Sequence, residues 1–226
     1  MVHCHLIHGI NEGLTDPAWP WEFMAHSFSR DVFAIYQPEH YWASAMPIWN
    51  HFVTNPKYGE ALAKRELLFQ KKDPSPIYIA AHSNGTNIAM HMIRRLAKEG
   101  YKIEKLLLFG STIHADVEES GLADLPVKQC IAYCSPRDVV AKYLEKIPKF
   151  YGSLGAQGFQ RDGKATGLKI KEFSPIPSEW GNEKQKFITR WFPDFGHSYY
   201  FDNKVSELTF DCMLNDLGLT INNYVL

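Results

Sequence analysis

The hydrophobic pattern alternates between short apolar runs and longer stretches in which apolar residues recur every three or four positions. The short runs predict β-strands, and the recurring pattern predicts helices with one apolar face. Strands are expected at residues 2–7, 32–36, 77–81, 105–109, 129–134 and 187–192. Helices are expected at residues 19–29, 58–70, 85–99, 139–147 and 206–217. This alternation predicts an α/β fold with helices flanking a mostly parallel central sheet of about six strands.

The chain length and the segments between these elements predict one domain without a large lid. The 226 residues fit a single domain over residues 1–226. The segment 111–126 is short and acidic, and it offers no long amphipathic insertion. The segment 150–181 is rich in Gly and Pro and is difficult to assign to any element. We therefore expect an open or shallow cleft.

One short motif carries candidate chemistry. The sequence A-H-S-N-G, with Ser83 at its centre, lies between the apolar run 77–81 and the helix that follows. A sharp strand-to-helix turn with small residues two before and two after the serine, here Ala81 and Gly85, exposes the hydroxyl beside a base. The alternative is that Ser83 only caps the helix.

This arrangement resembles the nucleophile elbow of the α/β-hydrolase family, with Ala81 in place of the family's first glycine. The resemblance implies an acid and then a histidine later in the chain. Asp138, in S-P-R-D-V-V after the fifth strand, is similar to the family's acid, although it could instead cap the helix after it. His197, in D-F-G-H-S after the last strand, is similar to the family's base. Asp194 is a weaker candidate for the acid.

The same resemblance implies an oxyanion hole made of two backbone N–H groups. One belongs to Asn84, directly after the serine. The other belongs to Ile10, because His8-Gly9-Ile10 after the first strand is similar to the family's H-G-x segment. His8 itself is interpreted as structural. The resemblance spans nearly the whole chain, from His8 to the last helix.

An aromatic loop at residues 37–54 follows the second strand, so it should lie on the same sheet edge as Ser83. It could line an apolar acyl or alcohol pocket, or it could pack on the core as a local cluster. The residues that we expect to contact substrate are Asn11, Tyr41, Trp42, His82, Ser111, Val140 and Tyr199.

Composition and charge exclude several classes of partner. Apolar residues make up 45% and charged residues 22% of the chain, and the formal net charge is −1. This balance argues against nucleic acid and anionic membranes as partners. The N-terminus lacks the features of a signal peptide and no stretch is long enough to span a membrane, so we expect a cytoplasmic location. The four cysteines show no metal-site spacing and are expected to be reduced thiols.

Together these features predict a serine hydrolase that cleaves a small-molecule carboxylic ester through a Ser-His-Asp triad and an acyl-enzyme. No metal or organic cofactor is expected. The alternatives are a non-catalytic binding protein with this fold, or a thioesterase, amidase or acyltransferase that uses the same triad.

Overall fold

The computed structural model describes residues 1–9, 32–36, 49–146, 151–161, 164–165, 178–182, 185–192, 195–197, 200 and 206–219. Within these residues, seven strands form one sheet in the order β2-β1-β3-β4-β5-β9-β8, and a separate ribbon pairs β6 with β7. The strands are β1 Val2–Ile7, β2 Val32–Tyr36, β3 Ile77–His82, β4 Ile103–Phe109, β5 Val127–Cys134, β6 Gln160–Arg161, β7 Lys164–Ala165, β8 Ser178–Asn182 and β9 Gln185–Trp191.

The described helices flank this sheet. They are the π-helical turn η1 Asn50–Thr54 and the α-helices α3 Asn55–Lys72, α4 Gly85–Lys98, α5 Val139–Leu144, α6 Leu154–Gln157 and α7 Ser206–Leu217. None of these helices is long and apolar enough to cross a membrane. The helix that the sequence predicts at residues 19–29 lies outside the described residues.

The predicted α/β architecture is confirmed, with one correction to the sheet. Six neighbouring strands from β2 to β9 run parallel, but β8 pairs with β9 in the antiparallel direction and adds a seventh strand. Its sequence, S-E-W-G-N, has no apolar run. An edge strand pairs with a neighbour on one side only. The hydrophobic pattern therefore does not reveal it.

The elements begin and end close to the predicted positions. The bounds of β1, β2 and α7 agree with the prediction, whereas β4 and β5 each begin two residues earlier. The helix α3 begins at Asn55 because Pro56, in its first turn, has a fixed φ and needs no intrahelical donor there. The helix α5 ends at Leu144, three residues before its predicted end.

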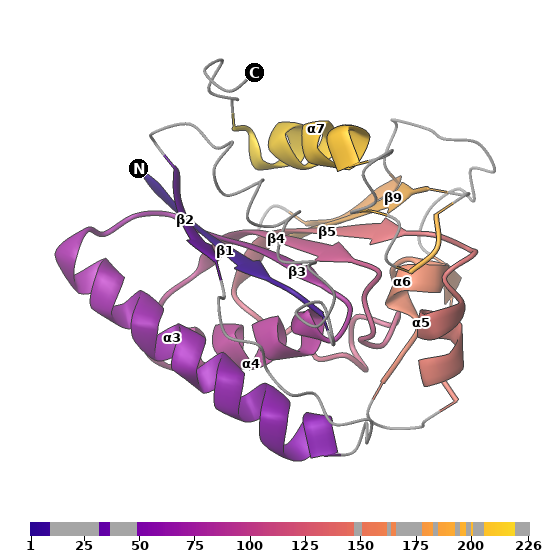
Figure 1. Ribbon diagram of the computed structural model, residues 1–226, viewed down its shortest axis with the longest axis horizontal. Helices are drawn as coiled ribbons and strands as arrows, with labels where there is room; N and C mark the ends of the chain where they lie inside the picture. The colour runs from indigo at the N-terminus through magenta and orange to yellow at the C-terminus, as the bar shows by residue number, and fades with distance from the viewer. Residues whose placement is uncertain are drawn as a thin grey trace.

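The sheet separates two apolar cores. Figure 1 shows α3 and α4 on one face and α7 on the other. The first core joins α3 and α4 to side chains of β3, β4 and β5, and it includes Ile88, Met92 and Leu108. The second core joins α7 to the opposite face of the same strands, and it includes Phe109 and Tyr133. Alternate residues of each central strand thus enter different cores, which explains the continuous apolar runs toward the carboxyl ends of β4 and β5.

The sheet order also determines where a ligand can bind. After β1 the chain moves outward to β2 and then returns to place β3 on the other side of β1. In an open α/β sheet, such a reversal leaves a crevice at the carboxyl ends of the two strands. The segments at that crevice are residues 8–9, after β1, and Ser83, after β3.

All four cysteines are free thiols, and Cys4, Cys130 and Cys134 are buried. Burial raises the pKa of Cys4 to about 12 and also raises the pKa of Cys134. These sulfur atoms are therefore protonated packing groups at neutral pH.

A buried polar cluster joins β1 to α3. The Nδ1 atom of His3 lies 2.9 Å from one carboxylate oxygen of Glu66, and the Nε2 atom of His5 lies 2.8 Å from the other. Gln70 donates a third hydrogen bond to this carboxylate, at 2.7 Å. Burial alone would raise the pKa of Glu66, but these hydrogen bonds lower it overall, whereas burial lowers the pKa of His5. The cluster therefore combines an ionised carboxylate with a neutral His5.

This cluster should make the fold sensitive to acid. Because the folded pKa of His5 lies below its ordinary value of 6.5, the folded state resists a proton that the unfolded chain accepts. Its contribution to stability is complete above pH 6.5 and is lost as the pH falls below that value. We expect the melting temperature to fall between pH 7 and pH 5, by less in His5→Gln, whose amide nitrogen can replace the Nε2 donor. Equal slopes in both proteins, measured by circular dichroism, would contradict this assignment.

Candidate active site

The strand β3 ends at a tight turn that holds Ser83 in an unusual backbone conformation. Among the described residues, Ser83 is the one non-glycine residue with a positive φ, at 52°. Its N–H donates to the carbonyl oxygen of Phe109 on β4, at 3.0 Å. Such strained geometry persists only where the surrounding structure holds it, and it is common at functional sites.

The carbonyl group of Ser83 is held equally firmly. It accepts hydrogen bonds from the N–H of Thr86 at 3.0 Å and from the hydroxyl of Thr86 at 2.6 Å. The hydroxyl of Thr112, from the loop after β4, contacts the same carbonyl oxygen at 3.4 Å. The turn is thus anchored from the helix on one side and from the next loop on the other.

Gly85 allows β1 and α4 to pass at very short range. A Cβ atom at this position would lie 2.4 Å from the carbonyl oxygen of His8 and 2.7 Å from that of Ile7. No side chain fits there without moving the backbone. The glycine therefore brings the first turn of α4 against the end of β1.

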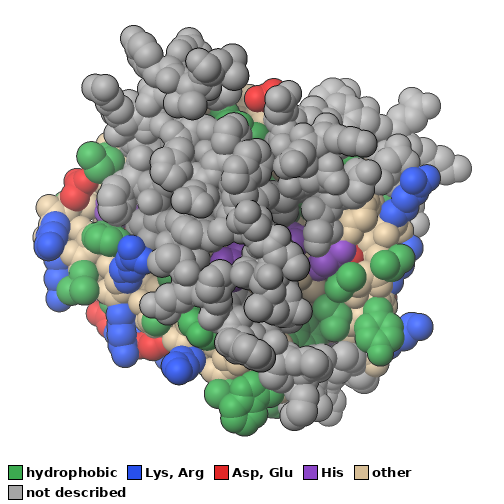
Figure 2. All heavy atoms as spheres, in the orientation of Figure 1, with side chains coloured by type: hydrophobic (Ala, Val, Ile, Leu, Met, Phe, Trp, Pro, Cys, Tyr) green, Lys and Arg blue, Asp and Glu red, His purple; other side chains and the backbone are tan. Residues whose placement is uncertain are grey.

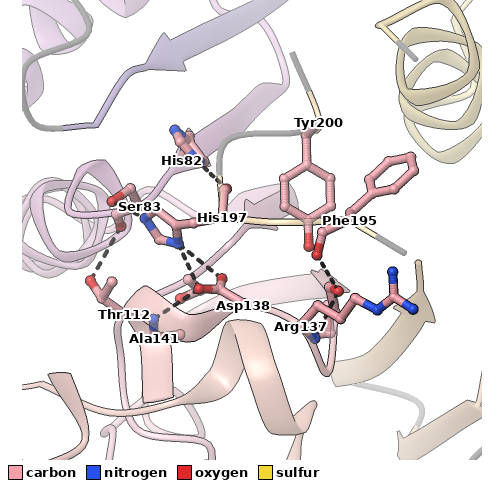
Figure 3. Close-up of polar contacts among 12 residues, drawn as sticks. His82, Ser83, Thr112, Arg137, Asp138, Ala141, Phe195, His197 and Tyr200 are labelled. Atoms are coloured by element: carbon pink, nitrogen blue, oxygen red, sulfur yellow. Dashed lines mark hydrogen bonds and ion pairs between the residues drawn. The ribbon is translucent and has the colours of Figure 1, made fainter. Parts of the chain in front are cut away.

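His197 connects Ser83 to Asp138 (Figure 3). The Nε2 atom of His197 lies 2.7 Å from the Ser83 hydroxyl oxygen. Its Nδ1 atom lies 2.9 Å from each carboxylate oxygen of Asp138. Because a carboxylate accepts, Nδ1 carries the proton that it donates to Asp138, and Nε2 is left as an acceptor for the serine hydroxyl. The three side chains come from the ends of β3, β5 and β9, and the structure brings them into one hydrogen-bonded row.

Asp138 makes two contacts at once, one for each of the alternatives that the sequence left open. Its side chain is fully buried and accepts a hydrogen bond from the N–H of Ala141 at 2.8 Å, which caps α5. The same carboxylate faces the imidazole of His197. A carboxylate has enough lone pairs for both partners, so the cap fixes the acid in place for the histidine. The weaker candidate, Asp194, lies outside the described residues.

The loop that carries Asp138 is tied directly to the loop that carries His197. The hydroxyl of Ser135 donates to the carbonyl oxygen of Phe195 and accepts from the N–H of Arg137 at 3.1 Å. Ser135 is fully buried. Sequence reasoning noted this serine only as a neighbour of the acid, because a hydroxyl that joins two loops leaves no spacing signal.

An aromatic platform supports the histidine loop from below. Phe195 and Tyr200, on either side of His197, pack edge to face with ring centroids 5.4 Å apart. The hydroxyl of Tyr200 donates to the carbonyl oxygen of Tyr133 on β5 at 3.1 Å. Phe192 contacts both Phe195 and Tyr200. Tyr200 therefore packs beneath the site and fixes the loop to the sheet.

His82 also contacts the histidine loop. It is buried, and its Nε2 atom lies 2.9 Å from the carbonyl oxygen of His197, so it donates its proton there. The two imidazole rings lie 5.3 Å apart. The sequence predicts His82 in the substrate site, whereas the structure uses it to connect the Ser83 turn to the backbone of His197.

Gly110, which sequence reasoning did not single out, packs against both His197 and Asp138. Its φ is +48°, and a Cβ atom there would lie 2.9 Å from the carbonyl oxygen of His197 and 3.3 Å from an Asp138 carboxylate oxygen. The only sequence signal for this role is a glycine directly after a buried strand.

We predict that Gly110→Ala lowers kcat by about 100-fold, because a misplacement of reacting groups by a fraction of an ångström to 1 Å has effects of this size. The left-handed conformation should also cost about 1 kcal/mol of folding free energy. Gly100→Ala is the matched control, since its φ is +82° and its added Cβ atom meets no neighbour within 4 Å. The control should lose stability and keep its kcat; equal kcat values for the two variants would refute the assignment.

Asn84 presents a backbone donor beside Ser83. Its side chain is occupied, because its amide exchanges two hydrogen bonds with that of Asn55, at 2.8 and 3.1 Å. Its backbone N–H, in contrast, donates to no acceptor among the described residues. An N–H group at a helix N-terminus in this state is suited to receive an anionic oxygen. The second expected donor, Ile10, lies outside the described residues.

The expected substrate-contacting residues divide into three groups. Ser111 is fully buried, and its hydroxyl donates to that of Thr86 at 3.2 Å, so it supports the turn and does not line a cleft. Val140 is 39% exposed on α5, directly after the acid loop. Asn11, Tyr41, Trp42 and Tyr199 lie outside the described residues.

The aromatic loop is described only at its end. Trp49 is 51% and Phe52 is 62% exposed, so these two rings do not pack in the core. Within the part of the chain that the structure describes, no group of three or more His, Cys, Asp and Glu side chains is arranged to hold a metal ion.

Comparison with known proteins supports the same fold. Residues 60–157 match the profile of a family described as "Alpha/beta hydrolase of unknown function (DUF900)". No curated protein matches the sequence. This family match supports a hydrolase.

Similar solved structures have low sequence identity to this chain. The NocB thioesterase domain, in a covalent complex with a fluorophosphonate nocardicin G analog, has a TM-score of 0.54 and 14% identity over 96% of each chain. TT1662 from Thermus thermophilus has a TM-score of 0.52 and 10% identity, over 96% of this chain and 89% of its own.

An uncharacterized protein from Bacillus cereus ATCC 10987 has a TM-score of 0.49 and 11% identity over 95% of this chain. The present chain spans 59% of the length of that protein. At these identities, the similarity to NocB and TT1662 concerns the fold alone. The matched segment at residues 60–157, the parallel sheet and the strand-to-helix turn at Ser83 together show that this chain has the α/β-hydrolase fold.

Proposed function

We propose that this protein is a serine hydrolase that cleaves carboxylic esters. The observation that carries the proposal is the continuous row of hydrogen bonds from the Ser83 hydroxyl through His197 to Asp138, with distances of 2.7 and 2.9 Å. A serine hydroxyl is a weak nucleophile unless a base within hydrogen-bond reach removes its proton. Here the base is held in the required tautomer by a buried carboxylate.

The reaction has two halves. The Ser83 oxygen attacks the ester carbonyl carbon while its proton moves to Nε2 of His197, and the N–H groups of Asn84 and Ile10 stabilise the oxyanion. The C–O bond to the alcohol then breaks, and His197 returns the proton to the departing oxygen. In the second half, His197 takes a proton from water, whose oxygen attacks the acyl-enzyme and releases the carboxylic acid and free Ser83.

Exposed apolar side chains beside the site favour an apolar acyl group. Val139, Val140 and Tyr143 on α5 are 69%, 39% and 66% exposed. Figure 2 shows hydrophobic side chains over α5 and near the start of α3 on one face of the molecule, with histidine side chains near the centre of the same face. A substrate that covers such surface gains free energy with each methylene group that leaves water.

The proposal is tested with a fluorophosphonate probe, which reacts covalently with an activated serine. We expect one adduct per chain, located at Ser83 by peptide mass spectrometry and absent in Ser83→Ala. A folded wild-type protein that does not react would favour the alternative, a binding protein that kept the fold without the chemistry.

The substrate class is tested with a series of p-nitrophenyl esters. We expect kcat/KM to rise by about fourfold per added methylene, the factor that corresponds to full burial, until the apolar surface is covered. A matched series of acyl thioesters tests whether sulfur leaving groups are preferred. An acetyl ester cleaved as fast as an octanoyl ester would contradict the apolar acyl site.

A further inference from the structure

A pocket lies along α4, the helix that begins just after the Ser83 turn. It has a volume of about 160 Å³ and is enclosed by α4, the η1 turn and the segment at residues 113–120. Its lining contains three imidazole groups, one guanidinium group and two further polar side chains, which are His51, His91, His114, Arg94, Asn87 and Ser120. The proposed reaction uses none of these side chains.

Arg94 brings a permanent positive charge to this pocket, and its described contacts compensate that charge only weakly. Arg94 makes one long hydrogen bond, 3.4 Å from its Nη2 atom to the carbonyl oxygen of Ser120, and it forms no ion pair among the described residues. The one carboxylate of the lining, Glu119, lies 3.9 Å from Nδ1 of His114 and has a side chain that is 72% exposed. An exposed carboxylate at this distance screens His114 weakly.

Burial has the largest effect on the pKa values of two histidine side chains in the lining. Burial, together with the smaller effects of the positive charges of Arg94 and His51, lowers the pKa of His91 to about 4. Burial and Arg94 also lower the pKa of His51. Both imidazole groups are therefore neutral at pH 7, and each offers one N–H donor beside the permanent charge of Arg94.

The walls of the pocket are fixed by close backbone contacts. A Cβ atom on Gly59 of α3 would lie 2.5 Å from the Cβ atom of His91, and one on Gly152 would lie 2.3 Å from the Cα atom of His114. The donors thus come from three segments of the chain held at fixed spacing. Fixed donors from different directions suit a tetrahedral oxyanion better than a planar carboxylate, which has only two oxygens.

The pocket is separated from the Ser83 hydroxyl by the turn itself. Asn87, which lines the pocket, donates to the hydroxyl of Thr112 at 2.9 Å, and Thr112 in turn contacts the carbonyl oxygen of Ser83. The hydroxyl of Ser83 instead donates a hydrogen bond to Nε2 of His197. A ligand in this pocket would therefore reach the turn only through Asn87 and Thr112, and it would leave the reacting hydroxyl free.

We propose that this pocket is a second binding site, distinct from the Ser83 site, for the phosphate group of a small molecule or for free phosphate. Arg94 supplies the charge and a pair of parallel N–H donors. Hydrogen bonds from such a charged group to phosphate oxygens are stronger than those from neutral donors. The imidazole N–H groups of His51, His91 and His114 supply further donors. Asn87 then connects the occupied pocket to the backbone of the nucleophile turn.

Isothermal titration with inorganic phosphate at pH 7 tests the proposal. We expect saturable binding with a dissociation constant on the order of 1 mM. Arg94→Gln should weaken it by about 10- to 100-fold, as is typical when a hydrogen bond to a charged group is lost. The matched control is Lys102→Gln, which removes one exposed positive charge at the opposite end of β4 and should leave the affinity unchanged.

Ser83→Ala should bind phosphate as wild type does, so this result does not depend on whether Ser83 is catalytic. In NMR titrations, saturating phosphate should raise the pKa of His91, because a bound anion favours the protonated ring. Tighter binding of glycerol phosphate than of inorganic phosphate would assign the pocket to a phosphate ester, and equal binding would assign it to the free anion. No saturable binding, an affinity unchanged in Arg94→Gln, or tighter binding of acetate would each overturn the proposal.

Discussion

Asp138→Asn is expected to lower kcat for ester hydrolysis by about 10⁴-fold with little loss of stability. Asparagine is as good a helix cap as aspartate, so its side-chain oxygen can still accept from the N–H of Ala141. Its amide NH₂ group then faces Nδ1 of His197 and needs an acceptor there. The imidazole must shift its proton to Nε2, and in that form it cannot take the proton of Ser83.

A second variant separates the two roles of Asp138. Asp138→Ala removes both the acid and the cap, so it should lose the same activity and, in addition, about 1 kcal/mol of folding free energy from the lost cap. The measurements are kcat on a p-nitrophenyl ester and the free energy of unfolding in urea. An asparagine variant within tenfold of the wild-type kcat would show that the carboxylate serves only as a cap.

Gly85→Ala is expected to destabilise the fold by about 3 kcal/mol, which is near the upper end for overpacked sites. The added methyl group would lie 2.4 Å from the carbonyl oxygen of His8, and both nearest contacts are backbone atoms that cannot rotate away. The end of β1 and the first turn of α4 must therefore separate. Because this turn carries the N–H of Asn84, kcat should fall as well.

The sign of this effect distinguishes the contact from helix propensity. In a helix, alanine is more favourable than glycine by about 1 kcal/mol, so without the contact the substitution would stabilise α4. Gly100→Ala, at the other end of the same helix, adds its Cβ atom to open space and should cost about 1 kcal/mol through backbone strain alone. Urea denaturation of both variants gives the comparison, and a stabilised Gly85→Ala protein would show that β1 and α4 do not meet this closely.

The sequence predicted those parts of the fold that depend on periodic burial. The central strands β3, β4 and β5 each carry a continuous apolar run because both faces are covered, and apolar runs of this kind are visible without a structure. The strand β8 pairs with β9 alone among the described strands, and its sequence S-E-W-G-N contains no apolar run. The same reason explains why β6 and β7 were not anticipated.

The candidate site divides in a similar way. Ser83 was found because it follows a predicted strand directly, and Asp138 and His197 because their loops after later strands resemble the acid and base segments of the α/β-hydrolase family. Ser135 and Gly110 were missed because their contribution is a contact with a loop distant in sequence. Ser111 and His82 were expected to contact substrate, and the hydrogen bonds that they make to Thr86 and to the backbone of His197 were not anticipated, since periodicity cannot tell which side of a turn a side chain faces.

The two apolar cores on either side of the sheet have a consequence for how activity should respond to denaturant. Ser83 is anchored through α4 in one core, whereas His197 rests on Phe195 and Tyr200, which belong to the other. The hydrogen bond between Ser83 and His197 therefore depends on how the two packed layers are positioned relative to each other. If urea loosens the α7 layer first, the proposed hydrolytic activity should be lost while the turn at Ser83 stays folded. Catalysis would then be lost before secondary structure.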